Sequence, residues 1–203
     1  MAGSILGNRV LRKEDPKFLT TGGVYVDDLN SEPLLVGALH ATFVRSTVAH
    51  ANILSIDISE ALESPGVVAI YTAEDLGLEP VAATFNPAAK RTLLASGKVR
   101  YVGEPVAVVL TQLANQGEDA AEKVIVDYDT LEVLIDIEQA MTSATHIYED
   151  CGSNVVFDST AIGMPDNTGD EMFADCEVVV KGSFVNQRVA PCPLEVRASA
   201  AAW

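Results

Sequence analysis

The side chains of this sequence best suited to bind a metal ion or transfer a proton are its three histidines, His40, His50 and His146. His40 and His50 fall in predicted neighbouring strands and could meet in space. No cysteine or acidic residue stands at a metal-ligand spacing from either. We therefore interpret each histidine as a hydrogen-bonded or exposed structural residue rather than as a ligand.

Two pairs of adjacent carboxylates, Glu14-Asp15 and Asp27-Asp28, have the residue types that general acid–base catalysis uses. Both pairs flank predicted turns, where Asp side chains commonly accept hydrogen bonds from the backbone. That structural function is the simpler interpretation. Ser46 is not a candidate nucleophile, because the Gly-x-Ser-x-Gly pattern is absent from the sequence.

The three cysteines, Cys151, Cys176 and Cys192, form neither a Cys-x-x-Cys metal pair nor, given their odd number, a complete disulfide framework. Cys192 lies between two prolines and has no neighbouring His or Lys that would activate its thiol. We expect all three to be free structural thiols.

Glycine-rich phosphate-binding loops are also missing, since neither Gly-x-Gly-x-x-Gly nor Gly-x-x-x-x-Gly-Lys-Ser/Thr occurs. The segment 100–105, Arg-Tyr-Val-Gly-Glu-Pro, predicts a tight turn before a buried strand, and we interpret it as architecture. Residue chemistry alone thus assigns no catalytic, cofactor-binding or metal-binding residue to this sequence.

Composition predicts a folded acidic protein. The 203 residues are 48% hydrophobic and 21% charged, which allows a sizeable core. The net charge of −16 repels phosphate backbones and anionic headgroups, so nucleic acids and membrane surfaces are poor candidate partners. The N-terminus lacks the apolar stretch of a signal peptide, and no run of 18 apolar residues occurs. We expect a cytoplasmic protein without a membrane span.

The stretch 99–141 is the part around which the other predicted elements are arranged. The apolar run 106–110 predicts a buried strand, and 124–129 predicts another. Between them, the spacing of apolar and small residues from Leu113 to Val124 predicts one face of a helix. We expect this helix to start near Gly117, because glycine inside a helix costs about 1 kcal/mol relative to alanine. Strand, helix and strand in about thirty residues is typical of a βαβ unit.

Shorter elements flank this unit and give an α+β fold class. Ser59, Thr72 and Asp136 are predicted helix caps, and Asp75 completes a capping box with Thr72. Residues 77–97 are expected to be irregular. Strands are predicted at 24–26, 34–45, 50–57, 67–71, 131–135 and 177–184, and short helices at 59–63, after Thr72, at 136–141 and at 170–175.

The domain organisation predicted from these elements has four parts. An extended arm covers 1–20, a folded domain covers 21–141 and a linker covers 142–169. The last part, 170–203, is too short to bury a core of its own without disulfides or metal. We therefore expect a fragment, or a part of a larger assembly, in which Phe184, Leu194 and Trp203 are partly exposed.

Many collinear stretches of the sequence resemble the large subunit of molybdenum hydroxylases, the family of xanthine dehydrogenase, aldehyde oxidase and aerobic carbon monoxide dehydrogenase. The resemblance is densest at 99–107, Val-Arg-Tyr-Val-Gly-Glu-Pro-Val-Ala. The other stretches are 8–9, 14–20, 23–29, 39–41, 43–46, 49–51, 55–57, 61–62, 65–69, 72–76, 118–122, 126–128, 186–188 and 193–197. Departures occur at Thr21-Gly22 and Thr47-Val48, both in predicted loops.

This resemblance implies that 21–141 is an α/β hammerhead domain and that 170–203 is the truncated start of a molybdopterin-binding domain. The residues at 186–188 and 193–195 are similar to those of the carbon monoxide dehydrogenase branch. A complete subunit would oxidise a small substrate with water as oxygen source, using a molybdopterin (cytosine dinucleotide) molybdenum cofactor. Its implied partners are the rest of the large subunit, an iron–sulfur small subunit and an FAD medium subunit, in an oligomer.

The family's Gly-Gly-x-Phe-Gly loop beside the molybdenum and its glutamate base have no counterpart in these 203 residues. We therefore transfer no catalytic, cofactor-binding or metal-binding residue, and we expect this fragment alone to be inactive and to bind no molybdenum. Whether the chain should be called an enzyme is left open. The alternative is a stand-alone hammerhead module that acts as a non-catalytic binding or assembly protein.

Overall fold

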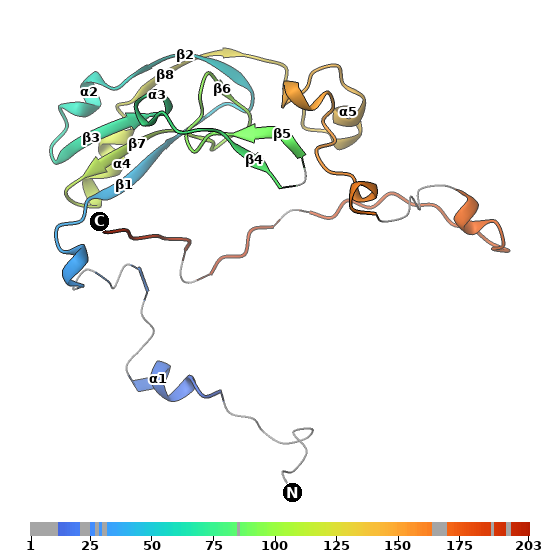
Figure 1. Ribbon diagram of the computed structural model, residues 1–203, viewed down its shortest axis with the longest axis horizontal. Coiled ribbons are helices and arrows are strands. Elements are labelled where there is room, and N and C mark those ends of the chain that lie inside the picture. Colours follow the sequence, from blue (N-terminus) through green and yellow to red (C-terminus); the bar gives the residue numbers. More distant parts are fainter. Residues whose placement is uncertain are drawn as a thin grey trace, which may run out of the picture. The chain divides into compact units, whose positions relative to one another are not determined.

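The computed structural model describes residues 12–20, 25–26, 29, 32–84, 86–163, 170–187, 189–193 and 196–203. The chain divides into two units, one of residues 1–38 with 184–203 and one of residues 39–183. The second unit, which we call the larger unit, contains all of the described strands (Figure 1).

The first sheet has three antiparallel strands in the order β1 (His40–Arg45), β7 (Pro105–Thr111) and β3 (Val67–Thr72). β7 occupies the centre, where Val109 pairs with Thr42 on one side and with Ile70 on the other. Its apolar run is almost fully buried, as expected for a central strand of β-branched residues. The predicted strands 106–110 and 67–71 are thereby confirmed.

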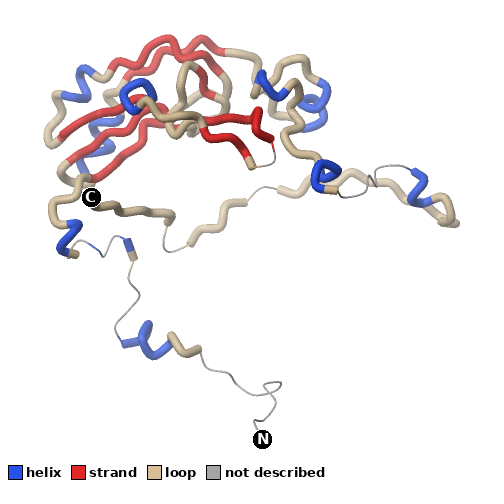
Figure 2. The backbone as a smooth tube through the Cα atoms, viewed as in Figure 1, coloured by secondary structure: helices blue, strands red, loops and turns tan. Residues whose placement is uncertain are grey.

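The second sheet is also antiparallel, in the order β6 (Lys98–Val99), β2 (Ala51–Asp57) and β8 (Ile125–Thr130). Its exposed side chains include Ser55, whose hydroxyl donates to the Asp127 carboxylate at 2.8 Å, and also the apolar Leu54 and Ile125. The alternating pattern that predicted the 50–57 strand thus separates a core face from a solvated face. Both sheets appear as red tubes in Figure 2.

Helix α4 (Asn115–Ala121) packs on the first sheet, where it contacts β1, β7 and β3. Gly117 permits this close approach, because a Cβ atom at that position would lie 2.0 Å from Thr42 Oγ1. Two short helices, α2 (Ser59–Leu62) and α3 (Ala73–Leu76), lie against β3.

The core consists of two clusters of small and β-branched residues. One cluster lies between α4 and the first sheet, and the other lies at the second sheet, where β7 begins. The buried members are Val44, Ala61, Ile70, Ala107, Val109, Ala120 and Val124 in the first cluster, and Ala51, Ala95, Val99 and Val106 in the second.

The predicted βαβ unit is wrong as a unit, although its elements exist. β7 and β8 belong to different sheets, and each pairs only with antiparallel neighbours. An apolar run specifies that a strand is buried but not which strand it pairs with, and tertiary packing made that choice here. The helix begins at Asn115, two residues before Gly117.

The stretch 77–97 is a second correction, since it contains the hairpin of β4 (Val81–Ala83) and β5 (Asn86–Arg91) rather than irregular chain alone. Several predicted strands do not form as expected. Residues 131–135 and 177–184 form no strand, and the 34–45 strand is shortened to β1, preceded by the 3-10 helix η2 (Pro33–Leu35).

The helix caps were predicted with mixed success. Thr72 and Asp75 form the expected capping box, and Asp136 caps α5 (Ile137–Thr142) by accepting from Gln139 N at 2.8 Å. Ser59 is the first residue of α2 rather than its N-cap, which is Ile58, and the Asp57 carboxylate accepts from Ser59 N at 2.9 Å.

The remaining elements are short helices. In the arm expected to be extended, 15–20 forms α1 (Asp15–Thr20), with Pro16 in the first turn, where proline is tolerated. Among the residues described after α5, three 3-10 helices form: η3 (Glu149–Cys151), η4 (Ser159–Ile162) and η5 (Asp170–Phe173). Of the predicted 24–26 strand, residue 24 lies outside the described residues, and the described Tyr25 and Val26 form no strand. None of the described helices is long and apolar enough to cross a membrane.

Candidate functional site

The turn Arg100–Pro105 joins β6 of the second sheet to β7 of the first sheet. Gly103 adopts a φ of 87°, which favours glycine. The backbone of this turn bonds to the end of β1, with Gly103 N donating to Ser46 O and Ser46 N donating to Glu104 O, both at 2.8 Å. Arg45 Nη1 also donates to Gly103 O at 2.9 Å. The turn therefore has the architectural function expected from the sequence.

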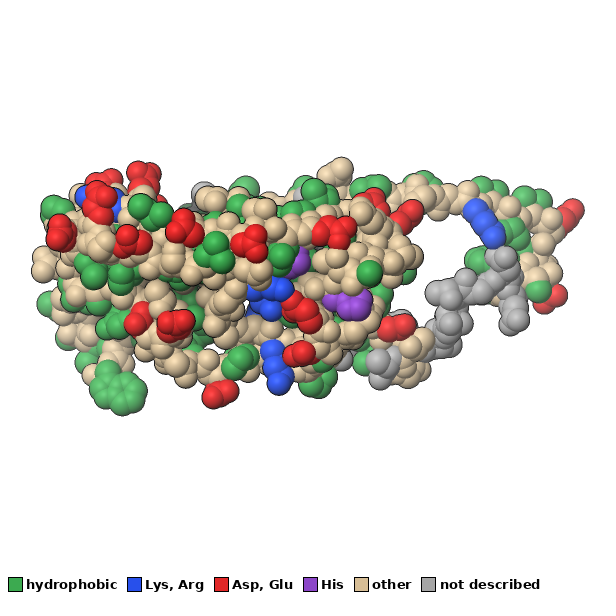
Figure 3. All heavy atoms as spheres, turned by 90° about the horizontal axis from the view of Figure 1, so that it is seen from above, with side chains coloured by type: hydrophobic (Ala, Val, Ile, Leu, Met, Phe, Trp, Pro, Cys, Tyr) green, Lys and Arg blue, Asp and Glu red, His purple; other side chains and the backbone are tan. Residues whose placement is uncertain are grey.

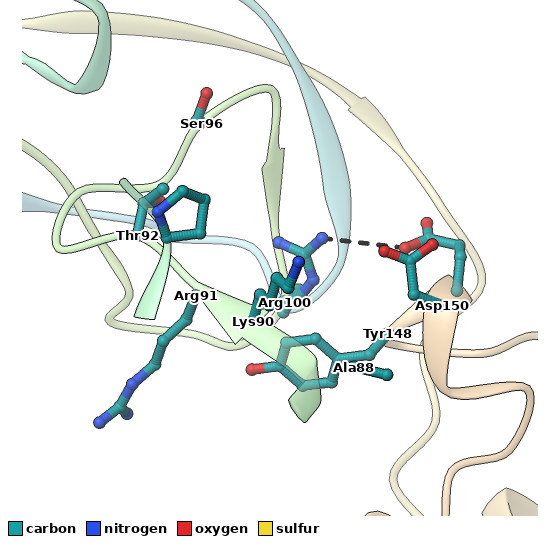
Figure 4. A pocket seen from close by; sticks show the side chains of 10 residues that line it. Ala88, Lys90, Arg91, Thr92, Ser96, Arg100, Tyr148 and Asp150 are labelled. Carbon is teal, nitrogen blue, oxygen red and sulfur yellow. Dashed lines mark ion pairs between the residues drawn. The ribbon is translucent and has the colours of Figure 1, made fainter. Parts of the chain in front are cut away.

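A cavity of about 310 Å³ opens next to this turn, beside β5 and η3 (Figure 4). Three cationic side chains line it: Lys90, Arg91 and Arg100. Its other polar groups are the hydroxyls of Thr92, Ser96 and Tyr148 and the carboxylates of Glu149 and Asp150. We call this cavity the basic hollow.

Arg100 is fixed in the wall of the basic hollow by three contacts. Its guanidinium carbon lies 5.1 Å from the centroid of the Tyr148 ring, within cation–π distance. Arg100 Nε donates to Ile147 O at 3.0 Å, and Nη2 lies 3.8 Å from Glu149 Oε2, the ion pair dashed in Figure 4. The guanidinium is thus held in one orientation before any ligand arrives.

Glu149 forms a second ion pair, with Lys98. The hydrogen bond from Lys98 lowers the pKa of Glu149, and the backbone N–H of Glu149 and the nearby Arg100 charge lower it further. Glu149 is therefore ionised at neutral pH. Through these contacts it fastens the segment that carries η3 to β6 and to the turn.

The three histidines do not form a metal site. His40 begins β1 in the first sheet, whereas His50 precedes β2 in the second, so their predicted neighbouring strands belong to different sheets. His50 is 3% exposed, and its Nδ1 donates to Glu132 O at 2.7 Å, which leaves the buried Nε2 without a partner among the described residues. His146 is half-buried. In the described part of the chain, no three His, Cys, Asp or Glu residues are grouped as a metal site requires.

The other candidate residues have structural contacts. Asp15 pairs with Arg12 at 3.6 Å on the surface, and Asp27-Asp28 lies outside the described residues. The Ser46 hydroxyl donates to Val48 O at 2.7 Å. The three cysteines are free, as expected: Cys151 is half-buried, and Cys176 and Cys192 are exposed.

The basic hollow was missed from the sequence because its lining combines part of the stretch interpreted as irregular with Arg100 and with residues of the predicted linker, Tyr148 to Asp150. The sequence did contain one indication of this site, a local excess of cationic residues. Lys90, Arg91, Lys98 and Arg100 are four of the 13 Lys and Arg residues in the chain, crowded into one short segment. On the face shown in Figure 3, blue Lys and Arg side chains likewise form small groups among more numerous red carboxylates.

Residues 20–132 match the family model described as "Aldehyde oxidase and xanthine dehydrogenase, a/b hammerhead domain". The match covers more than half of the chain. The chain therefore belongs to this family, and the larger unit contains its hammerhead fold.

Individual relatives agree with this assignment. The chain is 35% identical to the 6-hydroxypseudooxynicotine dehydrogenase complex subunit gamma of Paenarthrobacter nicotinovorans, over 95% of this chain and 25% of that protein. It is 38% identical to the carbon monoxide dehydrogenase large chain of Afipia carboxidovorans, over 94% of this chain and 24% of that protein. The chain thus spans about a quarter of the length of these curated relatives.

Solved structures give the same fold. The quinoline 2-oxidoreductase of Pseudomonas putida 86 superposes with a TM-score of 0.64 and 35% identity, covering 74% of this chain and 20% of that one. A Cu,Mo-CO dehydrogenase in its carbon monoxide reduced state superposes with a TM-score of 0.58 and 40% identity, covering 66% and 17% respectively.

The molybdenum cofactor that the family implies does not fit the residues described here. The sequence contains neither of the glycine-rich patterns that commonly cradle phosphate groups. Within the described ranges, no cluster of metal ligands is available either. No chemical step is therefore derived through this group.

Proposed function

We propose that this chain is the N-terminal part of the catalytic large subunit of a molybdenum-dependent hydroxylase of the carbon monoxide dehydrogenase type. The observation that carries the proposal is collinear similarity over nearly the whole chain to a relative named as a large chain. The hammerhead match at 20–132 supports it.

Within such a subunit, the cofactor would supply the redox chemistry that oxidises a small substrate with oxygen from water. The residues of this chain would act as scaffold. We propose an arm at 1–20, the hammerhead domain at 21–141, a linker at 142–169 and the start of a molybdopterin-binding domain at 170–203. The proposed partners are an iron–sulfur small subunit and an FAD medium subunit, in the cytoplasm.

The proposal is tested first by metal analysis of the purified 203-residue chain. We expect a folded protein without stoichiometric molybdenum and without hydroxylase activity, because its described residues offer no ligand cluster. Stoichiometric molybdenum would contradict this assignment of functions within the subunit.

The second test is the reading frame that encodes the chain. An in-frame continuation that encodes Gly-Gly-x-Phe-Gly shortly after Trp203 would support a catalytic large subunit. A stop codon at that point, together with a stable monomer in solution, would instead favour the stand-alone binding or assembly module.

A further inference from the structure

The basic hollow is a positively charged region on a strongly acidic protein. Three cationic side chains line it, and a fourth, Lys98, adjoins it through Glu149. Only two carboxylates lie among them, Glu149 and Asp150, whereas the whole chain carries a net charge of −16. Cationic side chains thus outnumber carboxylates in this concave lining, and an excess of positive charge attracts anions to this place.

Two of the cationic side chains are available to a ligand. Glu149 is already engaged by Lys98 and Arg100. Lys90 and Arg91 are exposed, and neither forms an ion pair within the part of the chain that the structure describes. Figure 4 shows Arg91 directed away from the other labelled side chains, at the margin of the basic hollow.

The basic hollow also has fixed and neutral donors. Arg100 is oriented by the Tyr148 ring and by Ile147 O, so its planar guanidinium is prepared for oxygen acceptors. Thr92 and Ser96 add hydroxyl donors. The volume of about 310 Å³ is at the lower limit for ligand pockets, which favours a small ligand.

We propose that the basic hollow binds a small anion with at least two negative charges, presented as a phosphate-type group or as paired carboxylates. Lys90 supplies a mobile charge, Arg100 a fixed donor fork, and Thr92 with Ser96 hydrogen bonds to the remaining oxygens. This proposal does not depend on the proposed large-subunit function.

The test is titration calorimetry of the 203-residue chain with inorganic pyrophosphate and, separately, with citrate. We expect one anion per chain, bound more weakly at about 150 mM than at about 20 mM salt, because exposed charges are screened. Lys90→Gln should weaken binding about threefold, and Lys90→Gln with Arg91→Gln about tenfold, as expected for exposed ion pairs. Circular dichroism of each variant checks that it is folded.

Lys123→Gln is the matched control, because it removes the same charge from a residue that does not line the basic hollow. Arg100→Lys keeps the charge and removes the planar fork, so it should weaken pyrophosphate binding while the protein stays folded. Preference for pyrophosphate over citrate would identify a phosphate-type ligand, and equal binding of both would identify a charge-selective site open to carboxylates.

The proposal is overturned if neither anion binds the folded chain at low salt. It is also overturned if Lys123→Gln weakens binding as much as Lys90→Gln does, because net charge alone would then explain the effect. Either result leaves the proposed large-subunit function untouched, since molybdenum content and the reading frame decide that function.

Discussion

At the residue scale, two contacts specify much of the larger unit. Gly117 allows α4 to approach β1 until only a hydrogen atom fits beside the Thr42 side chain. Glu149 joins Lys98 and Arg100 across segments that are distant in sequence. The Gly117 contact requires that no side chain is present, whereas the Glu149 contacts require a negative charge. Substitutions at the two positions therefore change the stability of the fold for different reasons.

Gly117→Ala should lower the free energy of unfolding by about 1–3 kcal/mol, because overpacking against Thr42 outweighs the better helix propensity of alanine. Urea denaturation measures the change. Combining it with Thr42→Ala should restore most of the loss, since the added methyl group would then occupy the vacated space. Equal stability of Gly117→Ala and the unsubstituted chain would show that the helix lies farther from the sheet.

The Glu149 ion pairs should stabilise the fold only above acidic pH. The pKa of Glu149 is lowered from 4.5 on folding, so its contribution is present above that value and declines as pH falls through the lower folded pKa. Because its side chain is 55% exposed, Glu149→Gln should cost less than about 1 kcal/mol at pH 7.

Urea denaturation of both proteins across the acidic range tests this dependence. We expect the difference in stability between Glu149→Gln and the unsubstituted chain to shrink as pH falls. A difference that stays constant would show that packing, rather than charge, accounts for the effect.

At the element scale, β7 is the strand on which the larger unit depends. It pairs with β1 and β3, and α4 packs on the sheet that it centres. Its residues alternate between the two faces of that sheet, so neighbouring substitutions separate the contribution of each face.

Val109→Ala should destabilise the fold by about 2–3 kcal/mol, because Val109 is fully buried in the first core cluster and its truncation leaves a cavity. Val108→Ala, on the opposite face and partly exposed, should cost clearly less. Thermal or urea unfolding measures both. The expected order reverses if the Val108 face, rather than the α4 face, is the tightly packed one.

At the scale of the whole molecule, a strand-rich unit is continued by a segment that forms no strand. In the described ranges 177–187, 189–193 and 196–203, no helix or strand forms and every residue is exposed. Apolar side chains are included, with Phe184 92% exposed. The expected exposure of Phe184 and Trp203 is confirmed, and Leu194 lies outside the described residues.

Limited digestion with chymotrypsin should therefore cleave after Phe184 before it cleaves inside the sheets. Proteases need extended, accessible backbone, and the strands must open before they fit an active site. Mass spectrometry of early products should show a resistant fragment that retains β1 to β8. First cuts between β1 and β8 would mean that the sheets open more readily than the terminal segment.

The sequence by itself determined the secondary elements wherever a local physical rule was strong. The alternation of apolar and polar residues predicted β2, and a run of β-branched apolar residues predicted β7. The capping box of Thr72 and Asp75 predicted the start of α3. Each depends on side chains that are near one another in sequence. The family could also be recognised from the sequence, because residue identities that occur in the same order can be compared without knowing which residues are in contact.

Only the tertiary structure decided how those elements pair and where the basic hollow lies. The residues 106–110 and 124–129 do not by themselves indicate that the two strands belong to separate sheets. The strands with which each of them pairs depend on packing across the core. Likewise, Lys90 and Tyr148 line one cavity only because β5 lies against η3. Contacts between residues so distant in sequence form only when the whole chain folds, and for this reason the sequence did not show that these residues line one cavity.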